Sequence, residues 1–177
     1  LVRVLSDVAQ SWLRPDYQNP PGKQQRGVEL VDDDEAEDAT PKKGAKGKKA
    51  AKGVKQAELM AAWLNAHLPK ATRILVSPAV RASQTANALG RDYETVAEIA
   101  PGADGVHVLA AAGWPDASGT VLVVGHQPTL GEVTSLLLYG EARPMSIKKS
   151  GVVWLTNRVR GSAPQTVLKA AMTVEML

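Results

Sequence analysis

The chain has 177 residues, 44% of them hydrophobic, and a formal net charge of +3. A chain of this length fits one globular domain that buries roughly 70% of its unfolded surface. It contains no cysteine, which excludes disulfides and thiolate metal sites. No apolar run approaches the roughly 20 residues that span a bilayer, and no secretory signal is visible, so we expect a cytoplasmic protein without membrane contact.

The N-terminal part of the chain gives weak signals of regular structure. The segment Val2–Leu13 is compatible with a short helix, and prolines at positions 15, 20 and 21 then break the chain. The apolar run Val28–Val31 is a candidate strand. We therefore predict a poorly defined segment over residues 1–27 and a single domain over residues 28–177.

Two charge runs of opposite sign follow that candidate strand. Six acids fall in the seven positions Asp32–Asp38, and seven lysines lie within Lys42–Lys55. The lysines alternate mainly with glycine and alanine, and no aromatic residue among them offers a base a stacking surface. A solvated loop over residues 32–52 is therefore favoured over a polyanion-binding tail, and nucleic acid is not the expected partner.

The pattern becomes regular from Gly53 onwards. Apolar residues recur at helical spacing between Gln56 and Leu68. Further helices are predicted over 79–89, 104–112 and 128–139, and strands over 73–76, 94–97, 120–124, 151–157 and 166–174. The alternation of strands and helices, ending in a hairpin, predicts a three-layer α/β/α sandwich with a mostly parallel central sheet and an antiparallel edge.

Two polar motifs follow the ends of predicted strands. Arg81 falls in the first turn of the helix after strand 73–76, and His126 follows strand 120–124 directly. Both strands are apolar and should be central, so the two side chains should emerge at the edge where open α/β sheets bind ligands. A guanidinium and an imidazole near free helix N–H groups favour an oxyanion such as phosphate. For His67 and His107, which lie on predicted helices, we expect structural roles.

These motifs resemble those of the histidine phosphatase superfamily, and the SixA group of phosphohistidine phosphatases is nearest. The residues concerned are Ser-Pro-x-x-Arg-Ala-x-Gln-Thr-Ala over Ser77–Ala86 and Val-Val-Gly-His-Gln-Pro over Val123–Pro128. Weaker similarity in the helix after Lys52 and in the final hairpin extends the resemblance to about residues 52–177. It implies a phosphoglycerate mutase-like fold.

The resemblance also implies an activity. Enzymes of this group hydrolyse phosphohistidine on a protein such as a histidine-phosphotransfer domain, in signal transduction, through a phosphohistidine formed on the enzyme and without a metal or other cofactor. Arg81 and His126 match the second arginine and second histidine that surround the phosphoryl oxygens, and Gln127 would offer its backbone N–H. A small-molecule phosphomonoesterase of the same superfamily is the alternative enzyme.

The chain departs from the family pattern at the nucleophile. The family places an Arg-His pair after its first strand, whereas Asp32 and Asp33 occupy those positions here and no histidine precedes His67. Unit charges about 4 Å apart at an effective dielectric near 20 interact by about 4 kcal/mol, and two carboxylates would repel a phosphate by amounts of that order. The sequence as written should have little activity by the family mechanism.

Three interpretations of this departure stay open. Residues 1–51 as written do not represent the natural protein, or the chain is a catalytically inactive module that binds phosphorylated partners. Alternatively, Asp32–Asp34 hold Mg²⁺ as the acidic pair of a response-regulator receiver domain does. The last is disfavoured because Ser77 stands where a receiver needs its phospho-accepting aspartate.

Overall fold

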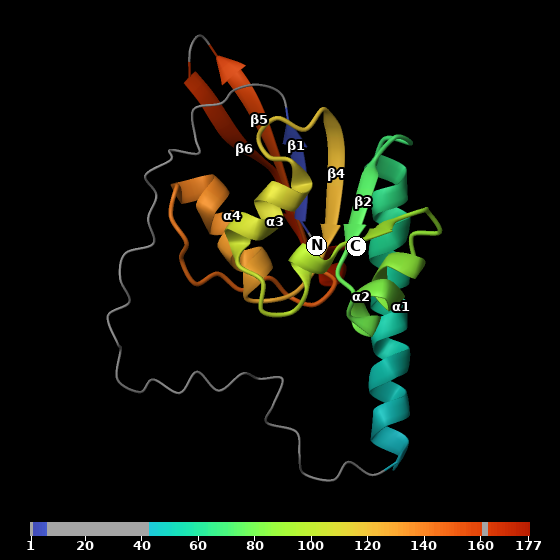
Figure 1. Ribbon diagram of the computed structural model, residues 1–177. Coiled ribbons are helices and arrows are strands. Elements are labelled where there is room, and N and C mark those ends of the chain that lie inside the picture. Colours follow the sequence, from blue (N-terminus) through green and yellow to red (C-terminus); the bar gives the residue numbers. More distant parts are fainter. Residues whose placement is uncertain (1, 7–42, 161–162) are drawn as a thin grey trace, which may run out of the picture.

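The computed structural model describes residues 2–6, 43–160 and 163–177, and these form a six-stranded sheet with helices on both faces (Figure 1). The strand order is β3-β2-β4-β1-β5-β6. Strand β2 is parallel to both β3 and β4, and the hairpin β5–β6 makes an antiparallel edge. The strands are β1 Val2–Ser6, β2 Arg73–Val76, β3 Glu94–Thr95, β4 Gly119–Val124, β5 Val152–Arg160 and β6 Ala163–Met172. The predicted α/β sandwich is confirmed.

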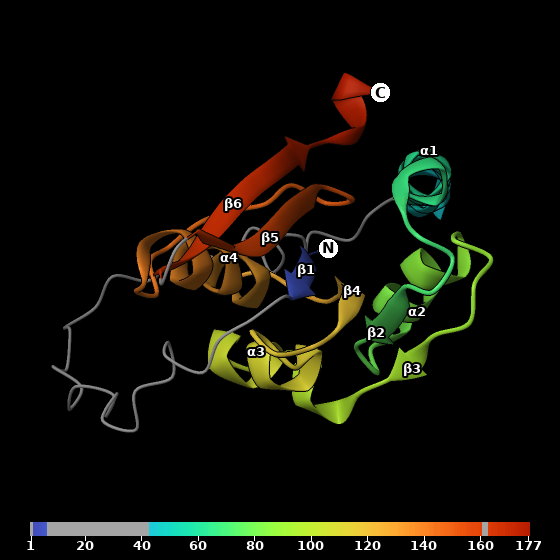
Figure 2. The same cartoon turned by 90° about the horizontal axis from the view of Figure 1, so that it is seen from above.

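Helices α1 and α2 cover one face of the sheet, and α3 and α4 cover the other (Figure 2). The helices are α1 Lys43–His67, α2 Val80–Asn87, α3 Gly105–Ala112 and α4 Thr129–Tyr139, and short 3₁₀ turns cover Ala97–Ile99 and Val174–Met176. The carboxylate of Asp104 accepts a hydrogen bond from the backbone N–H of His107 at 2.8 Å and caps α3. Gly113 and Gly140 end α3 and α4 in the left-handed conformation.

The first strand differs from the sequence-based expectation. Val2–Ser6 is a strand, not the start of a helix, and it lies between β4 and β5, antiparallel to β4 and parallel to β5. A run of five residues is too short for its periodicity to distinguish a strand from a helix. The segment is a strand because its backbone pairs with β4 on one side and β5 on the other. It also adds an antiparallel pairing inside the sheet that was not predicted. The candidate strand Val28–Val31 lies outside the described residues.

Helix α1 begins about ten residues earlier than expected. It starts at Lys43, so part of the segment expected to be a loop over 32–52 is helical. Lysine and alanine are good helix formers, and a helix already nucleated by the packed part near Met60 extends at little further cost. The N-terminal half of α1 extends beyond α2 (Figure 1). The acidic run Asp32–Asp38 lies outside the described residues.

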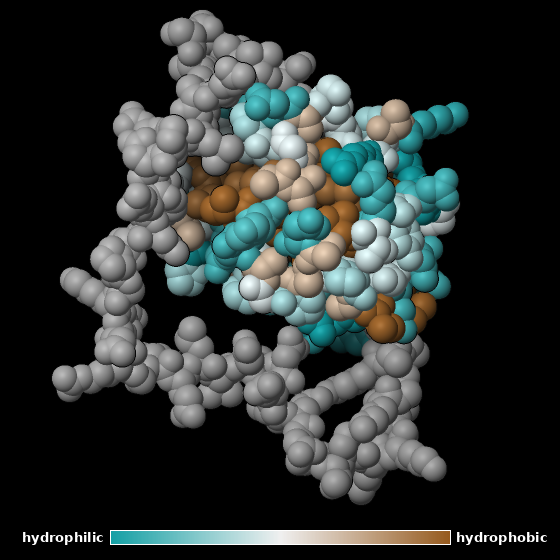
Figure 3. All heavy atoms as spheres, viewed as in Figure 1, coloured by the Kyte–Doolittle hydropathy of each residue, from teal (hydrophilic) through white to brown (hydrophobic). Residues whose placement is uncertain are grey.

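Alternate residues of the central strands point to opposite faces of the sheet, and each face has its own hydrophobic core. On the α1–α2 side the strands contribute Ile74, Val76, Leu122 and Val124. On the α3–α4 side they contribute Leu75, Val121 and Val123. This period of two places both β2 and β4 at the centre of the molecule. On the side seen in Figure 1, apolar residues also reach the surface between polar ones (Figure 3).

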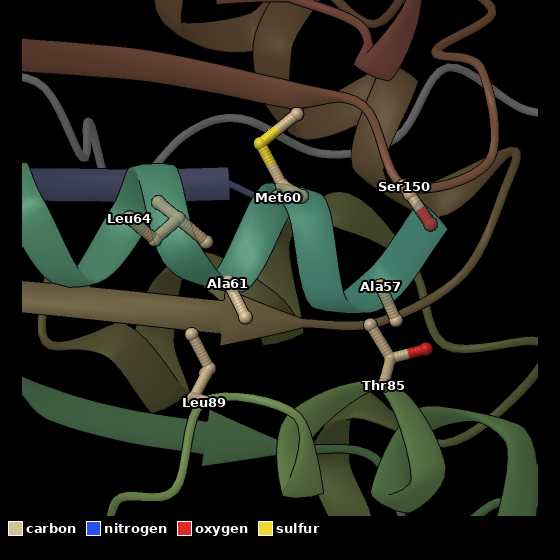
Figure 4. Close-up of a pocket in the computed structure, with 7 residues that line it drawn as sticks. All are labelled: Ala57, Met60, Ala61, Leu64, Thr85, Leu89 and Ser150. Carbon is tan, nitrogen blue, oxygen red and sulfur yellow. The ribbon is translucent and has the colours of Figure 1, made fainter. Parts of the chain in front are cut away.

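Helix α2 is held against α1 along small and apolar side chains. A narrow crevice remains between them, and Ser150 of the loop that precedes β5 also lines it (Figure 4). Its lining consists of Ala57, Met60, Ala61 and Leu64 of α1 with Thr85, Leu89 and Ser150. The packing fixes the position of α2, which carries Arg81 in its first turn. In the described part of the chain, no helix combines the length and apolar character needed to cross a membrane.

Candidate oxyanion site

The parallel pairing of β2 and β4 brings the two polar motifs to one edge of the sheet. Val76 and Val124, the last residues of these strands, are in register. The backbone N–H of Ser77 then donates to the carbonyl of Val124 at 3.0 Å. The segments that follow β2 and β4 therefore leave the sheet side by side.

Arg81 and His126 meet at this edge. Nε of Arg81 donates to Nδ1 of His126 across 3.3 Å. His126 is only 8% exposed, whereas Arg81 is exposed to solvent. The structure thus brings together the two residues singled out in the sequence, with the guanidinium as the outer member of the pair.

Ser77 contacts the other side of the imidazole. Its Oγ lies 2.7 Å from Nε2 of His126, and its side chain is fully buried. The same Oγ accepts the backbone N–H of Ala79 at 3.3 Å. Sequence reasoning did not include Ser77 among the site residues. The available signal was a polar residue directly after a buried apolar strand, next to the motif that supplies Arg81.

The environment of His126 favours its neutral form. Burial, and then the positive charge of Arg81, lower the pKa of the imidazole below its ordinary value. The ring is therefore held as a neutral hydrogen-bonding group beside a cation. An anion that approaches the pair would offset the charge of Arg81 and so favour the protonated imidazole.

The loop Glu141–Ser150 borders the same edge. A Cβ on Gly131, in the first turn of α4, would overlap the carbonyl oxygen of Met145 and come within 3.1 Å of Oε1 of Gln127. At its other end, Ser150 lines the crevice beside Thr85, one turn after Arg81. The exposed Gln127 follows His126 directly, and its role in binding stays a prediction.

The two other histidines make contacts within their own helices. Nδ1 of His67 donates to the carbonyl of Trp63 at 2.7 Å, and the two rings stack. Nδ1 of His107 lies 2.8 Å from the carboxylate of Asp104. Asp32 and Asp33, which the sequence comparison predicts at the nucleophile positions, lie outside the described part of the chain.

Within residues 2–6, 43–160 and 163–177, no three metal-ligating side chains gather into a candidate metal site. The alternative of Mg²⁺ binding at Asp32–Asp34 falls outside these ranges and stays a hypothesis.

The similarity to known proteins agrees with the motifs. No family model matches the chain. The chain is 33% identical over 99 residues to phosphohistidine phosphatase SixA of Escherichia coli K12. The chain resembles SixA. The matched region covers 51% of this chain and 61% of the Escherichia coli protein, so it spans less than two thirds of that relative.

Solved SixA structures share the fold. A SixA structure complexed with tungstate has a TM-score of 0.55 at 21% identity and covers 99% of this chain and 97% of its own. The SixA structure from Agrobacterium tumefaciens has a TM-score of 0.55 at 21% identity, and the match covers 97% of this chain and 96% of that chain. The SixA structure from Nakamurella multipartitia has a TM-score of 0.52 at 25% identity, and the match covers 67% of this chain and 80% of that chain. The expected resemblance to the SixA group of the histidine phosphatase superfamily is confirmed.

Proposed function

We propose that this chain is a SixA-type phosphatase that acts on phosphohistidine in a protein, such as a phosphotransfer domain of a cytoplasmic signalling pathway. The contact between Arg81 and His126 at the carboxyl edge of the sheet carries the proposal. The similarity to the SixA of Escherichia coli supports it, since that protein is named for this activity. The tungstate in a related SixA structure supports oxyanion binding by this fold.

In this proposal the arginine receives the phosphoryl group first. Arg81 is exposed and His126 is not, so an anion reaches the guanidinium before the imidazole. As the anion enters, it replaces the bond between Nε of Arg81 and Nδ1 of His126. A proton taken up at Nδ1 then makes the imidazole a second donor. Charge-assisted bonds of this kind are roughly twice as strong as neutral ones.

Backbone groups supply further donors in the same proposal. Arg81 lies in the first turn of α2, and His126 lies just before α4. Helix N-termini present free N–H groups and a partial positive charge, which favour a bound anion. The backbone N–H of Gln127 is proposed as one of these donors. Together they would balance the charge on the phosphoryl oxygens in the net hydrolysis, in which the P–N bond to the substrate histidine breaks and water supplies the oxygen of the new P–O bond.

Binding without hydrolysis is a second candidate function, and two observations favour it. The chain has three histidines, and His67 and His107 are engaged within their own helices. In addition, β1 begins at the edge of His126, with Val2 opposite Val123, and therefore ends at the opposite edge. Because the family's nucleophile follows the carboxyl end of its first strand, β1 in this direction does not deliver one to the site.

Phosphate release from a phosphohistidine-bearing protein separates the two functions. The full chain is compared with Arg81→Ala and His126→Ala, with Arg91→Ala and His107→Ala as controls. Release that only the site variants lose supports the phosphatase. Binding of the phosphoprotein without release, again lost only in the site variants, supports the binding module. If the site variants change neither measurement, both functions are wrong. Release from p-nitrophenyl phosphate but not from the phosphoprotein would favour a small-molecule phosphomonoesterase.

A further inference from the structure

We propose that Ser77 is a positioning residue that holds the imidazole of His126 so that Nδ1 faces Arg81 and the incoming phosphoryl group. The effect on phosphate binding rests on the proposed function, whereas the hydrogen bonds of His126 do not depend on it. Nε2 lies 2.7 Å from Oγ of Ser77, and Nδ1 lies 3.3 Å from Nε of Arg81. The ring is therefore fixed at both nitrogens.

The contact with Arg81 indicates which nitrogen of His126 carries the proton while Ser77 holds the ring in this orientation. A guanidinium has only N–H donors, so Nδ1 of His126 must accept and is unprotonated. In the neutral ring the proton then resides on Nε2, which donates to Oγ of Ser77. The reverse tautomer would place two N–H groups against each other between Arg81 and His126. The free site therefore holds the Nε2–H tautomer.

Ser77 is itself held rigidly. It is fully buried, and its backbone N–H is bonded to the carbonyl of Val124 across the β2–β4 pairing. Its Oγ also accepts the N–H of Ala79 at the start of the turn into α2. The backbone of Ser77 thus joins the end of β2, which precedes Arg81, to the end of β4, which precedes His126, and this fixes the position of the hydroxyl. It ties the imidazole to the sheet more firmly than an exposed side chain would.

Anchoring Nε2 leaves Nδ1 as the nitrogen that changes its partner. In the free protein Nδ1 accepts from Arg81. When an oxyanion binds, Nδ1 gains one proton and donates to an oxygen of the anion, while the Nε2–H···Ser77 bond is unchanged. Without Ser77, Nε2–H would be buried without a partner and the ring would rotate or change tautomer, which misdirects the donor.

The test uses two variants of the full chain. Ser77→Ala lacks the hydroxyl, whereas Ser77→Thr keeps it. Ser135→Ala is the matched control, because Ser135 is also fully buried and its hydroxyl also makes two hydrogen bonds, to Glu132 and Arg143. ¹⁵N NMR of the imidazole nitrogens gives the tautomer in the absence of any ligand. Calorimetry with inorganic phosphate gives the affinity.

We expect the Nε2–H tautomer of His126 in the unchanged protein, in Ser77→Thr and in Ser135→Ala. Ser77→Ala should show mixed tautomers and a phosphate affinity lower by roughly tenfold, the change that the loss of one hydrogen bond produces. The Nδ1–H tautomer in the unchanged protein would overturn the inference even if Ser77→Ala failed to fold, and so would an unaltered tautomer in folded Ser77→Ala. If phosphate does not bind any variant but the tautomer changes as expected, the positioning role stands and the proposed function fails.

Discussion

Arg81 and His126 are 45 residues apart in the chain, yet Nε of the arginine donates to Nδ1 of the histidine across 3.3 Å. The contact exists because β2 and β4 are parallel neighbours whose last residues are in register. It couples an exposed cation to a buried titratable group. Several measurable properties of the protein depend on that coupling.

Replacing Arg81 by alanine should raise the pKa of His126 and weaken phosphate binding. The positive charge of Arg81 is the second cause, after burial, of the low pKa of this histidine. A hydrogen bond to a charged group contributes about 1.5–3 kcal/mol, so the affinity should fall roughly 10- to 100-fold. An NMR titration and calorimetry measure the two effects. Arg91→Ala, whose guanidinium binds the carbonyl of Pro69, should change neither, and a lower pKa of His126 in Arg81→Ala would contradict the argument.

The stability of the protein should decrease in mild acid because of His126. Its pKa in the folded protein lies below its ordinary value, about 6.5, which it regains on unfolding. Between these two values the unfolded state binds more protons, so the free energy of unfolding rises with pH. The contribution is complete above about pH 6.5 and is lost as the pH falls through the folded pKa.

Urea unfolding at about pH 7.5 and about pH 5.5 measures this dependence. His126→Gln should show a smaller loss of stability between the two pH values than the unchanged protein. His107→Gln is the control, since His107 is exposed on α3. Equal losses in the unchanged protein and in His126→Gln would show that His126 titrates normally.

A methyl group at Gly131 should damage both the fold and the site. The Cβ would overlap the carbonyl oxygen of Met145, which is backbone and cannot move without the loop Glu141–Ser150. We expect Gly131→Ala to lower the melting temperature and to weaken phosphate binding, since α4 begins three residues after His126. Gly53→Ala is the matched control. Its Cβ meets nothing within 4 Å on an exposed helix, so it should stabilise the protein by up to about 1 kcal/mol. Equal melting temperatures for the two variants would refute the close approach.

Proline at position 4 should destabilise the sheet. Val4 lies in the middle of β1 and pairs with Val121 of β4 on one side and Leu155 of β5 on the other. Proline lacks the N–H that a central strand donates, and a buried carbonyl left without its partner costs about 1–3 kcal/mol. Val4→Ala keeps the N–H and separates this loss from that of the side chain. Denaturant unfolding measures the stability of both variants. If Val4→Pro has the same free energy of unfolding as Val4→Ala, the pairing of β1 adds little to the stability of the sheet.

The sequence predicted the parts of the fold whose signals are local and repeated. Strands β2 and β4 are apolar runs of several residues, and α3 carries both its Asp104 cap and its Gly113 terminator. The meeting of Arg81 and His126 followed from parallel strands alone. The sequence did not predict β1, because a run of five residues has no decisive period and its place depends on two distant edges. It also missed Ser77, because only the three-dimensional packing shows that its hydroxyl meets an imidazole from another strand.

Strand β1 is the only link by backbone pairing, among the described residues, between the β3-β2-β4 group and the β5–β6 hairpin. If these five residues were displaced, β4 and β5 would each expose a row of unpaired N–H and C=O groups. Open edges of this kind recruit strands from other molecules. A version of the protein that loses this strand should therefore self-associate, and the same vacancy would accept a short extended peptide of apolar character.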